Sequence, residues 1–262
     1  MRKSSFFSSA IVGGLVFVAS CGSDSATGPT SANANLSAAL SQTSYGDVSS
    51  FSSTSALTKI PSAATPSVDP NSCTYSSSDG AFTCPTKAAS GVSFQLKYFL
   101  YNASGVGMTA YDPAVTSKLR AVWDASGTFT SSGATQASVQ IDHHSDMTLD
   151  GLLGTSRTLN GTSNAHDIVD TGSGSDAVHL VVDATGTAAN VVLPAAAGQY
   201  PASGLLSSDV AFTTTSNSQS ASATLHGTLE FDGTKFAMLT INTGVGANIC
   251  TIDLTGGTAP SC

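Results

Sequence analysis

From Cys73 onward, apolar and polar residues alternate with a period of two, and this alternation constrains the fold more than any other feature. The stretch SATLHGTLEF at residues 222–231 is the clearest case. Its apolar residues Ala223, Leu225, Leu229 and Phe231 are interspersed with polar ones. Successive side chains of a β-strand point to opposite faces of a sheet, so the alternation predicts strands with one buried face.

Further segments share this alternation and are separated by turn residues. Asp232-Gly233 predicts a tight turn into a strand at residues 235–241, and Asn160-Gly161 predicts another turn. The other predicted strands lie at residues 93–101, 119–124, 137–149, 175–183, 188–193, 210–215 and 248–254. We therefore expect a mainly β fold with a single antiparallel domain at residues 71–262, built as a sandwich or as a half-open barrel.

Acidic residues outnumber basic ones, and nearly all of them are short. The chain has 17 Asp and Glu against 9 Lys and Arg, and Glu230 is its single glutamate. Aspartate favours turns and strand ends, whereas helix faces normally carry glutamate and lysine, so the composition argues against a helical protein. The negative charge also disfavours nucleic acid and anionic lipid surfaces as partners.

The N-terminus has the three parts of a secretory signal. Arg2 and Lys3 precede an apolar run at residues 10–19, and VASC ends the signal at residues 18–21. This ending resembles the lipobox of bacterial lipoproteins, in which the cysteine is acylated and becomes the new N-terminus. The resemblance covers the signal alone. It implies that residues 1–20 are removed and that palmitate or a similar acyl chain on Cys21 anchors the protein to a membrane without spanning it.

The residue after the cysteine bears on the destination of the protein. Position 22 is glycine, whereas the lipoproteins that the signal resembles have aspartate there when they stay at the inner membrane. The resemblance therefore implies delivery to the outer membrane. Removal of residues 1–20 would also remove two basic residues, which leaves seven Lys and Arg against 17 Asp and Glu and a formal charge of −10.

Two segments separate this cysteine from the β domain. Residues 21–32 have the Gly, Ser and Pro content of a flexible tether. Residues 33–70 form a leader rich in Ser, Ala and Pro, in which Leu36, Ala39 and Leu40 recur at helical spacing. One or two short helices are expected in this leader.

Four further cysteines fall into two local pairs. Cys73 and Cys84 bracket the turn signal SSSDG, and Cys250 and Cys262 bracket TGG. An even number of cysteines in an exported chain predicts disulfides, and local pairing is preferred among the three possible connectivities. No C-x-x-C motif is present, so thiol redox chemistry and thiolate zinc sites have no support.

The stretch VQIDHHSDMTLDG at residues 139–151 is the first candidate site. In a strand, His143 falls on the apolar row, whereas Asp142, His144 and Asp146 fall on the polar row. Because the outer two positions of the polar row lie about 13 Å apart, two of these side chains can converge on one ion and three cannot. A zinc site would therefore need a ligand from a neighbouring strand, and a solvated polar face is the alternative.

The stretch HDIVDTGSGSD at residues 166–176 is the second candidate. Residues 168–173 resemble the active-site loop of aspartic proteases, which implies catalysis by Asp170. Those enzymes need two such aspartates, and the chain has no second D-T/S-G motif. Asp167, Asp170 and Asp176 also fit a weak calcium-binding turn, and an Asp/Gly-rich connection between strands is the alternative.

The sequence favours a non-enzymatic lipoprotein over an enzyme. We expect it to bind or carry a hydrophobic small molecule, to contact another envelope protein, or to be a structural component of the envelope, with no required cofactor. An envelope hydrolase or metal-binding protein that uses Asp142, His144, Asp146 or Asp170 is the alternative. An apolar groove without converging acids would favour the first function. Asp142 and His144 within about 4 Å of an acid or histidine from another strand would favour the second.

Overall fold

A single antiparallel sheet makes up the described part of the chain. The computed structural model describes residues 70–89, 91–131, 137–172, 177–195, 200–216, 219–242 and 246–254. Its elements are a short 3-10 helix, Pro70–Ser72, and 13 strands. The strands are β1 (Thr74–Ser76), β2 (Ala81–Thr83), β3 (Lys87–Ala89), β4 (Val92–Asn102), β5 (Gly107–Met108), β6 (Thr116–Ser131), β7 (Ala137–Asp150), β8 (Ser156–Thr171), β9 (Val178–Pro194), β10 (Ser203–Ser216), β11 (Gln219–Phe231), β12 (Phe236–Asn242) and β13 (Ala247–Asp253).

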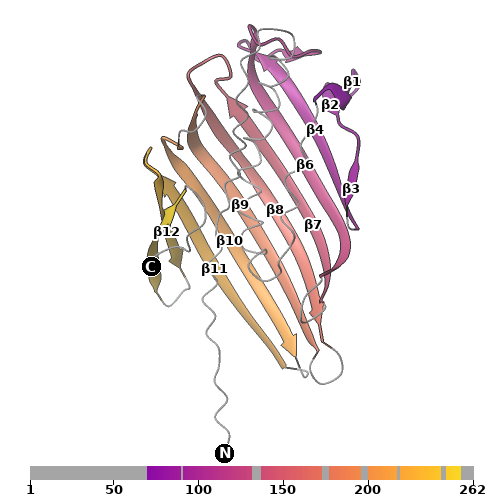
Figure 1. Cartoon of the computed structure of the whole chain (residues 1–262), viewed down its shortest axis with the longest axis vertical. Coiled ribbons are helices and arrows are strands. Elements are labelled where there is room, and N and C mark those ends of the chain that lie inside the picture. Colours follow the sequence, from indigo (N-terminus) through magenta and orange to yellow (C-terminus); the bar gives the residue numbers. More distant parts are fainter. Residues whose placement is uncertain are drawn as a thin grey trace, which may run out of the picture.

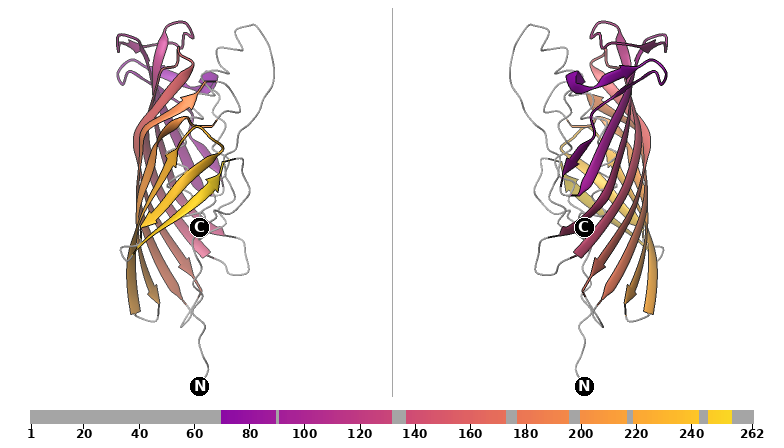
Figure 2. Two further views of the ribbon diagram at one scale, coloured as in Figure 1. Left: turned by 90° about the vertical axis from the view of Figure 1, so that its left-hand side faces the viewer. Right: turned by 90° about the vertical axis from the view of Figure 1, so that its right-hand side faces the viewer.

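The sheet follows the chain order almost without interruption. Its path runs β1-β2-β4-β6-β7-β8-β9-β10-β11-β12-β13, and β3 and β5 pair with β4 beside that path. Figure 1 shows the long strands β6 to β11 side by side. The path begins at β1 and ends at β13 without closing into a barrel. In the side views of Figure 2, β1–β3 at one edge and β12–β13 at the other turn toward the same side, so the sheet is curved.

The predicted fold class is therefore confirmed, and the structure distinguishes between the two architectures that were expected. A sandwich needs two sheets, whereas all 13 described strands belong to one sheet. The half-open barrel is the architecture that fits. The short helices predicted within residues 33–70, the signal at residues 1–20 and the cysteine at position 21 lie outside the described residues.

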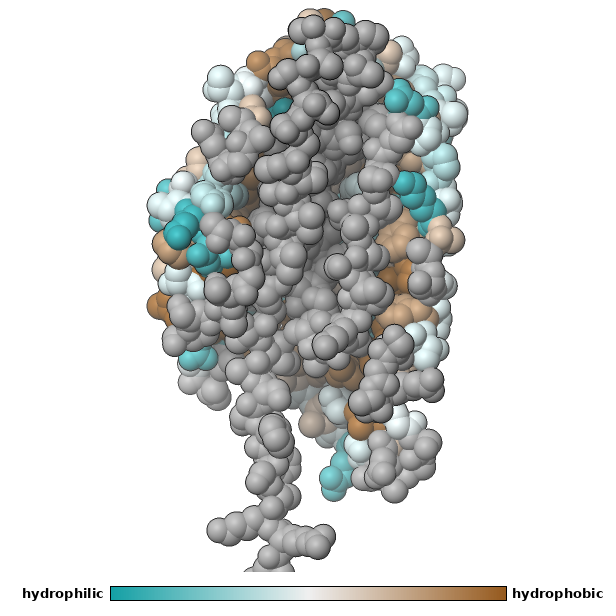
Figure 3. Space-filling view, in the orientation of Figure 1, coloured by the Kyte–Doolittle hydropathy of each residue, from teal (hydrophilic) through white to brown (hydrophobic). Residues whose placement is uncertain are grey.

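The alternation in the sequence divides the sheet into an apolar face and a polar face. Along β7, buried and more exposed side chains alternate without exception, from Ala137 on the apolar face to Asp150 on the polar face. The largest buried cluster joins Phe82 of β2, Leu119 of β6, Leu193 of β9 and Ile252 of β13. The cluster therefore runs across the sheet from one edge to the other. Figure 3 views the molecule from the side toward which both edges turn and shows apolar side chains in brown along both flanks, so the apolar face is the concave one.

Several strands are longer than predicted. The two strands predicted at residues 175–183 and 188–193 are one strand, β9, of 17 residues. Ala184, Gly186 and Ala188 keep the alternation on the apolar face where the sequence Thr-Gly-Thr suggested a break. Strand β8, which was not predicted, runs from Ser156 to Thr171, so most of the second candidate stretch belongs to a strand and not to a connection.

The turn predicted at Asn160-Gly161 was wrong. This dipeptide lies inside β8, at a β-bulge where the register with β9 shifts between Leu159 and Gly161. Gly161 has φ +155°, and a Cβ atom there would lie 2.3 Å from the carbonyl oxygen of Asp146. The glycine thus permits close approach of two strands rather than a reversal of the chain. The turn predicted at Asp232-Gly233 does join β11 to β12, with Gly233 at φ +85°.

The disulfide between Cys73 and Cys84 is confirmed. Thr74 pairs with Thr83, so the two cysteines extend the β1–β2 hairpin by one position. Cys250 is also disulfide-bonded, and its predicted partner Cys262 lies outside the described residues. None of the helices in the described part of the chain is long and apolar enough to cross a membrane.

Candidate functional site

Each of the five histidines lies within hydrogen-bonding distance of an aspartate on a neighbouring strand. Four of these pairs lie on the polar face, and their Nδ1···Oδ1 distances are 2.6–2.7 Å. In each exposed pair the two residues are directly opposite one another in the strand register. The exposed pairs are His144–Asp124, His166–Asp183, His179–Asp170 and His226–Asp209.

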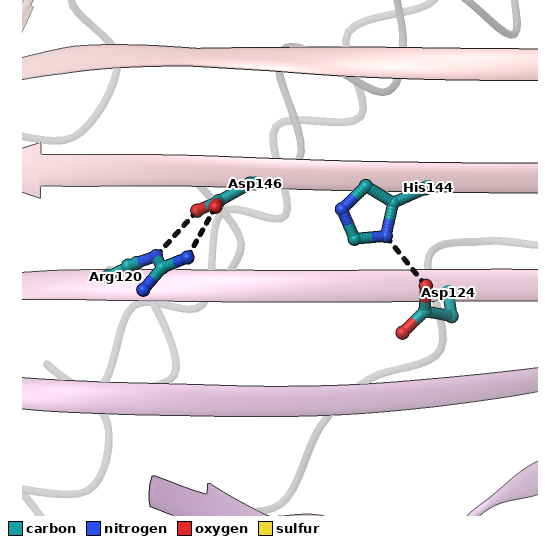
Figure 4. Close-up of polar contacts among 4 residues, drawn as sticks. All are labelled: Arg120, Asp124, His144 and Asp146. Carbon is teal, nitrogen blue, oxygen red and sulfur yellow. Dashed lines mark hydrogen bonds and ion pairs between the residues drawn. The ribbon is translucent and has the colours of Figure 1, made fainter. Parts of the chain in front are cut away.

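Two polar side chains of the first candidate site contact separate partners on the neighbouring strand β6. Figure 4 shows that His144 contacts Asp124, whereas Asp146 accepts two hydrogen bonds from Arg120 on the same neighbouring strand, at 2.8 Å and 2.6 Å. Arg120 lowers the pKa of Asp146, through these hydrogen bonds first and through its charge second. The carboxylate of Asp146 is therefore neutralised by a guanidinium and is a poor metal ligand.

A metal site or a hydrolase was expected to have both Asp142 and His144 within about 4 Å of an acid or histidine from another strand. Among the described residues, His144 has such a neighbour and Asp142 does not. His144 lies 2.7 Å from an acid of another strand, but three further exposed pairs on this face have the same contact. Across the described ranges, no three His, Cys, Asp or Glu side chains lie close enough together to hold a metal ion. The repetition indicates a general mode of cross-strand pairing on the polar face and not one specialised centre.

The second candidate site is divided between the two faces of the sheet. Asp170 is exposed and pairs with His179, whereas Asp167 is fully buried on the apolar face. Their side chains cannot share one ion, and the third predicted ligand, Asp176, lies outside the described residues. Asp170 also belongs to strand β8 and not to a loop of the kind that the resemblance to aspartic proteases implied.

The polar face has an open hollow of about 460 Å³ over the central strands. Its polar lining includes Asp142, His144, His166, Asp183 and Asp209. The lining residues come from β7 to β11, and most of the charged ones belong to the exposed His–Asp pairs. Ala165, Ala184, Val210 and Ala211 also line the hollow, so its lining combines charged and apolar side chains.

The apolar face contains a group of buried polar residues, here called the polar centre: His143, Ser145, Ser163 and Asp167. All four have exposed fractions of 6% or less. His143 Nε2 lies 2.7 Å from Asp167 Oδ1, and Ser145 is directly opposite Ser163. Along β7 the polar centre separates Val139 and Ile141 from Met147 and Leu149, which are apolar and buried.

Four half-buried side chains at one end of the apolar face are here called the apolar rim. The rim consists of Phe94, Phe129, Leu180 and Phe212, which pack against two small clusters of buried residues. Val169, directly opposite Leu180, lies two residues beyond Asp167 on the same face of β8. Asp167 of the polar centre therefore lies roughly 7 Å along β8 from Val169, the residue that is paired with Leu180 of the rim.

The alternation placed His143 on the apolar face, but no strand was predicted at residues 156–171 and its partner was missed. Asp167 falls on the apolar row of β8, and Ala165 and Val169 at the same spacing were the available signal. The pairing itself depends on the register between β7 and β8, which the alternation does not specify. Comparisons of the chain with models of known protein families, with curated proteins and with solved structures found no match.

Proposed function

We propose that this protein is an exported, non-enzymatic lipoprotein of the cell envelope that binds a hydrophobic small molecule on the apolar face of its half-open sheet. The observation that carries the proposal is the apolar rim. Three phenylalanines and a leucine remain half-buried at one end of the apolar face, next to two small clusters of buried residues. When an apolar ligand covers the water-exposed surface of large apolar side chains, the free energy of the system falls.

The shape of the sheet supports the same function. An open, curved sheet has a concave face that widens or narrows when its edge strands move, because β1 and β13 are not paired with each other. An apolar crevice of about 20 Å³ already lies between Phe94, Leu96 and Trp123. A ligand with a long alkyl chain needs more room, so uptake requires the rim side chains to move apart.

The proposed location rests on the resemblance of VASC at residues 18–21 to a lipobox and on the glycine that follows it. The disulfide between Cys73 and Cys84 supports export, because disulfides persist in oxidising compartments. The acyl chains on Cys21 would keep the domain at the outer membrane, beside a supply of hydrophobic ligands.

Fluorescence titration with the apolar probe N-phenyl-1-naphthylamine tests the binding function. The mature protein is expected to bind the probe saturably, with displacement by long-chain amphiphiles. Leu180→Glu places a charge on the apolar rim and should weaken binding about tenfold or more, because burial of one leucine is worth about 1.5–3 kcal/mol.

Val181→Glu is the matched control. Val181 is the next residue of β9, is also partly buried, and points to the polar face. This variant should bind the probe within about twofold of the wild type. Equal loss of binding in both variants, or no saturable binding by the wild type, would contradict the proposal.

A further inference from the structure

We infer that the polar centre binds the head group of the ligand, and that this head group is a neutral hydrogen-bond donor such as an alcohol or an amide. The inference rests on the proposed function, because it concerns the ligand of the same apolar face. It adds the chemical class of that ligand: an amphiphile with a donor at one end, and not a free fatty acid.

Two buried oxygen atoms of the polar centre have no hydrogen-bond partner among the described residues. Asp167 is fully buried, and its Oδ1 atom contacts His143. Its Oδ2 atom is also buried and has no hydrogen-bond partner among the described residues. The hydroxyl oxygen of Ser145 is likewise buried and has no hydrogen-bond partner in the described part of the chain. A buried polar atom without a partner costs about 1–3 kcal/mol, so each such atom in a folded protein requires an explanation.

The unpaired acceptor, Oδ2 of Asp167, belongs to a residue with apolar neighbours on both sides. Asp167 lies opposite Ile141 on one side and Val182 on the other, both of them apolar and buried. The buried cluster of Val92, Val139, Ile141 and Val169 begins next to Asp167 and extends across the sheet to β4. An alkyl chain that entered between the rim side chains packed on this cluster would therefore place its head group at Asp167.

The unpaired acceptor restricts the head group that can bind. An ionised carboxylate accepts hydrogen bonds but cannot donate them, so the ligand must supply the donor. A hydroxyl or an amide N–H can donate to Oδ2 of Asp167. An ionised fatty acid has no proton to donate to Oδ2 of Asp167 and would bring its charge into a water-poor site, which is strongly unfavourable. The polar centre therefore discriminates between ligands that have the same alkyl chain and different head groups.

Displacement of N-phenyl-1-naphthylamine by dodecanol, dodecanamide and laurate tests the inference on the mature wild-type protein. The three competitors share a chain length and differ in the head group. We expect the alcohol and the amide to displace the probe at concentrations at least about tenfold lower than laurate. Comparable displacement by all three would overturn the inference and leave the proposed function intact. Failure of the probe and of every competitor to bind would overturn both.

Asp167→Asn provides a second readout, because the asparagine amide can itself donate a hydrogen bond. The preference for dodecanol over laurate should fall to about twofold or less in this variant. Asp142→Asn, which removes an exposed carboxylate from the polar face, is the control and should keep the wild-type preference. An unchanged preference in a folded Asp167→Asn variant would contradict the assignment, and the wild-type competition still decides the question if that variant does not fold.

Discussion

His143 and His144 are neighbours in the chain, yet their surroundings differ completely. Both lie 2.7 Å from an aspartate of an adjacent strand. The side chains of His143 and Asp167 are 7% and 0% exposed, whereas those of His144 and Asp124 are 49% and 54% exposed. Water competes for the exposed pair and is excluded from the buried one, so only the buried contact should matter strongly for stability.

His143→Ala is therefore expected to lower the free energy of unfolding by about 3 kcal/mol, because the buried carboxylate of Asp167 loses this contact. His144→Ala removes the same chemical group one residue away and should cost less than about 1 kcal/mol. Urea denaturation of the two variants, followed by circular dichroism, measures both values. Equal destabilisation would contradict the assignment of the two histidines to different environments.

Arg120 and Asp146 give the polar face a contact that depends on pH. The pKa of Asp146 lies below its ordinary value of 3.8, because Arg120 donates hydrogen bonds to it and attracts its charge. A carboxyl group with a lowered pKa contributes stability above its ordinary pKa and loses that contribution as the pH falls through the lowered value.

Arg120→Met is therefore expected to be less stable than the wild type by about 0.5–1 kcal/mol at pH 7, a modest value because both partners are partly solvated. The difference should shrink as the pH falls below about 4. Thermal denaturation at pH 7 and pH 3 measures it. A difference that stays constant with pH would show that Arg120 acts through packing, for example against the ring of Phe99, whose centroid lies 5.2 Å away.

At the scale of the strands, glycines set how closely neighbouring strands approach. Gly127 of β6 is directly opposite Val92 of β4 and has φ +153°. A Cβ atom at this position would lie 2.2 Å from the carbonyl oxygen of Gly91 and 2.8 Å from the Cα atom of Val92. Both contacts are to backbone, which can shift only if the two strands separate.

Gly127→Ala should lower the free energy of unfolding by about 1–3 kcal/mol through backbone strain and strand separation. Gly107→Ala is the matched control, since no heavy atom lies within 4 Å of a Cβ atom at that position. Its stability should change by less than about 0.5 kcal/mol. Denaturant titration compares the two variants, and a stable Gly127→Ala protein would contradict the close approach of β4 and β6.

The alternation predicted which face each residue occupies, because side-chain direction follows from local sequence alone. It assigned Ile141 and His143 to the apolar face and His144 to the polar face, as observed. It did not predict partners such as Asp124 for His144, because register between strands depends on contacts distant in sequence. The turn prediction at Asn160-Gly161 was wrong for a related reason. This dipeptide is typical of hairpin turns, but its glycine is equally suited to a bulge.

At the scale of the whole molecule, the proposed anchor and the β domain are separate parts of the chain. The described sheet begins at Thr74, more than fifty residues after Cys21. Attachment to the membrane should therefore depend on the signal and not on the sheet.

Cys21→Ser is expected to move the protein from the membrane fraction to the soluble fraction of the envelope, because serine cannot receive the thioether-linked lipid. Cell fractionation with immunoblotting measures the shift, and Cys73→Ser serves as a control that changes a different cysteine. Retention of Cys21→Ser in the membrane would contradict lipid anchoring.

Photolabelling tests most directly whether the ligand binds to the apolar face. A dodecanol with a diazirine on its alkyl chain can be bound to the mature protein, irradiated, and the labelled residues mapped by mass spectrometry. We expect adducts at the apolar cluster beside Asp167, in the strand segments that contain Ile141, Val169 and Leu180. Adducts confined to the exposed apolar side chains of Phe236, Met238 and Ile249 would contradict it.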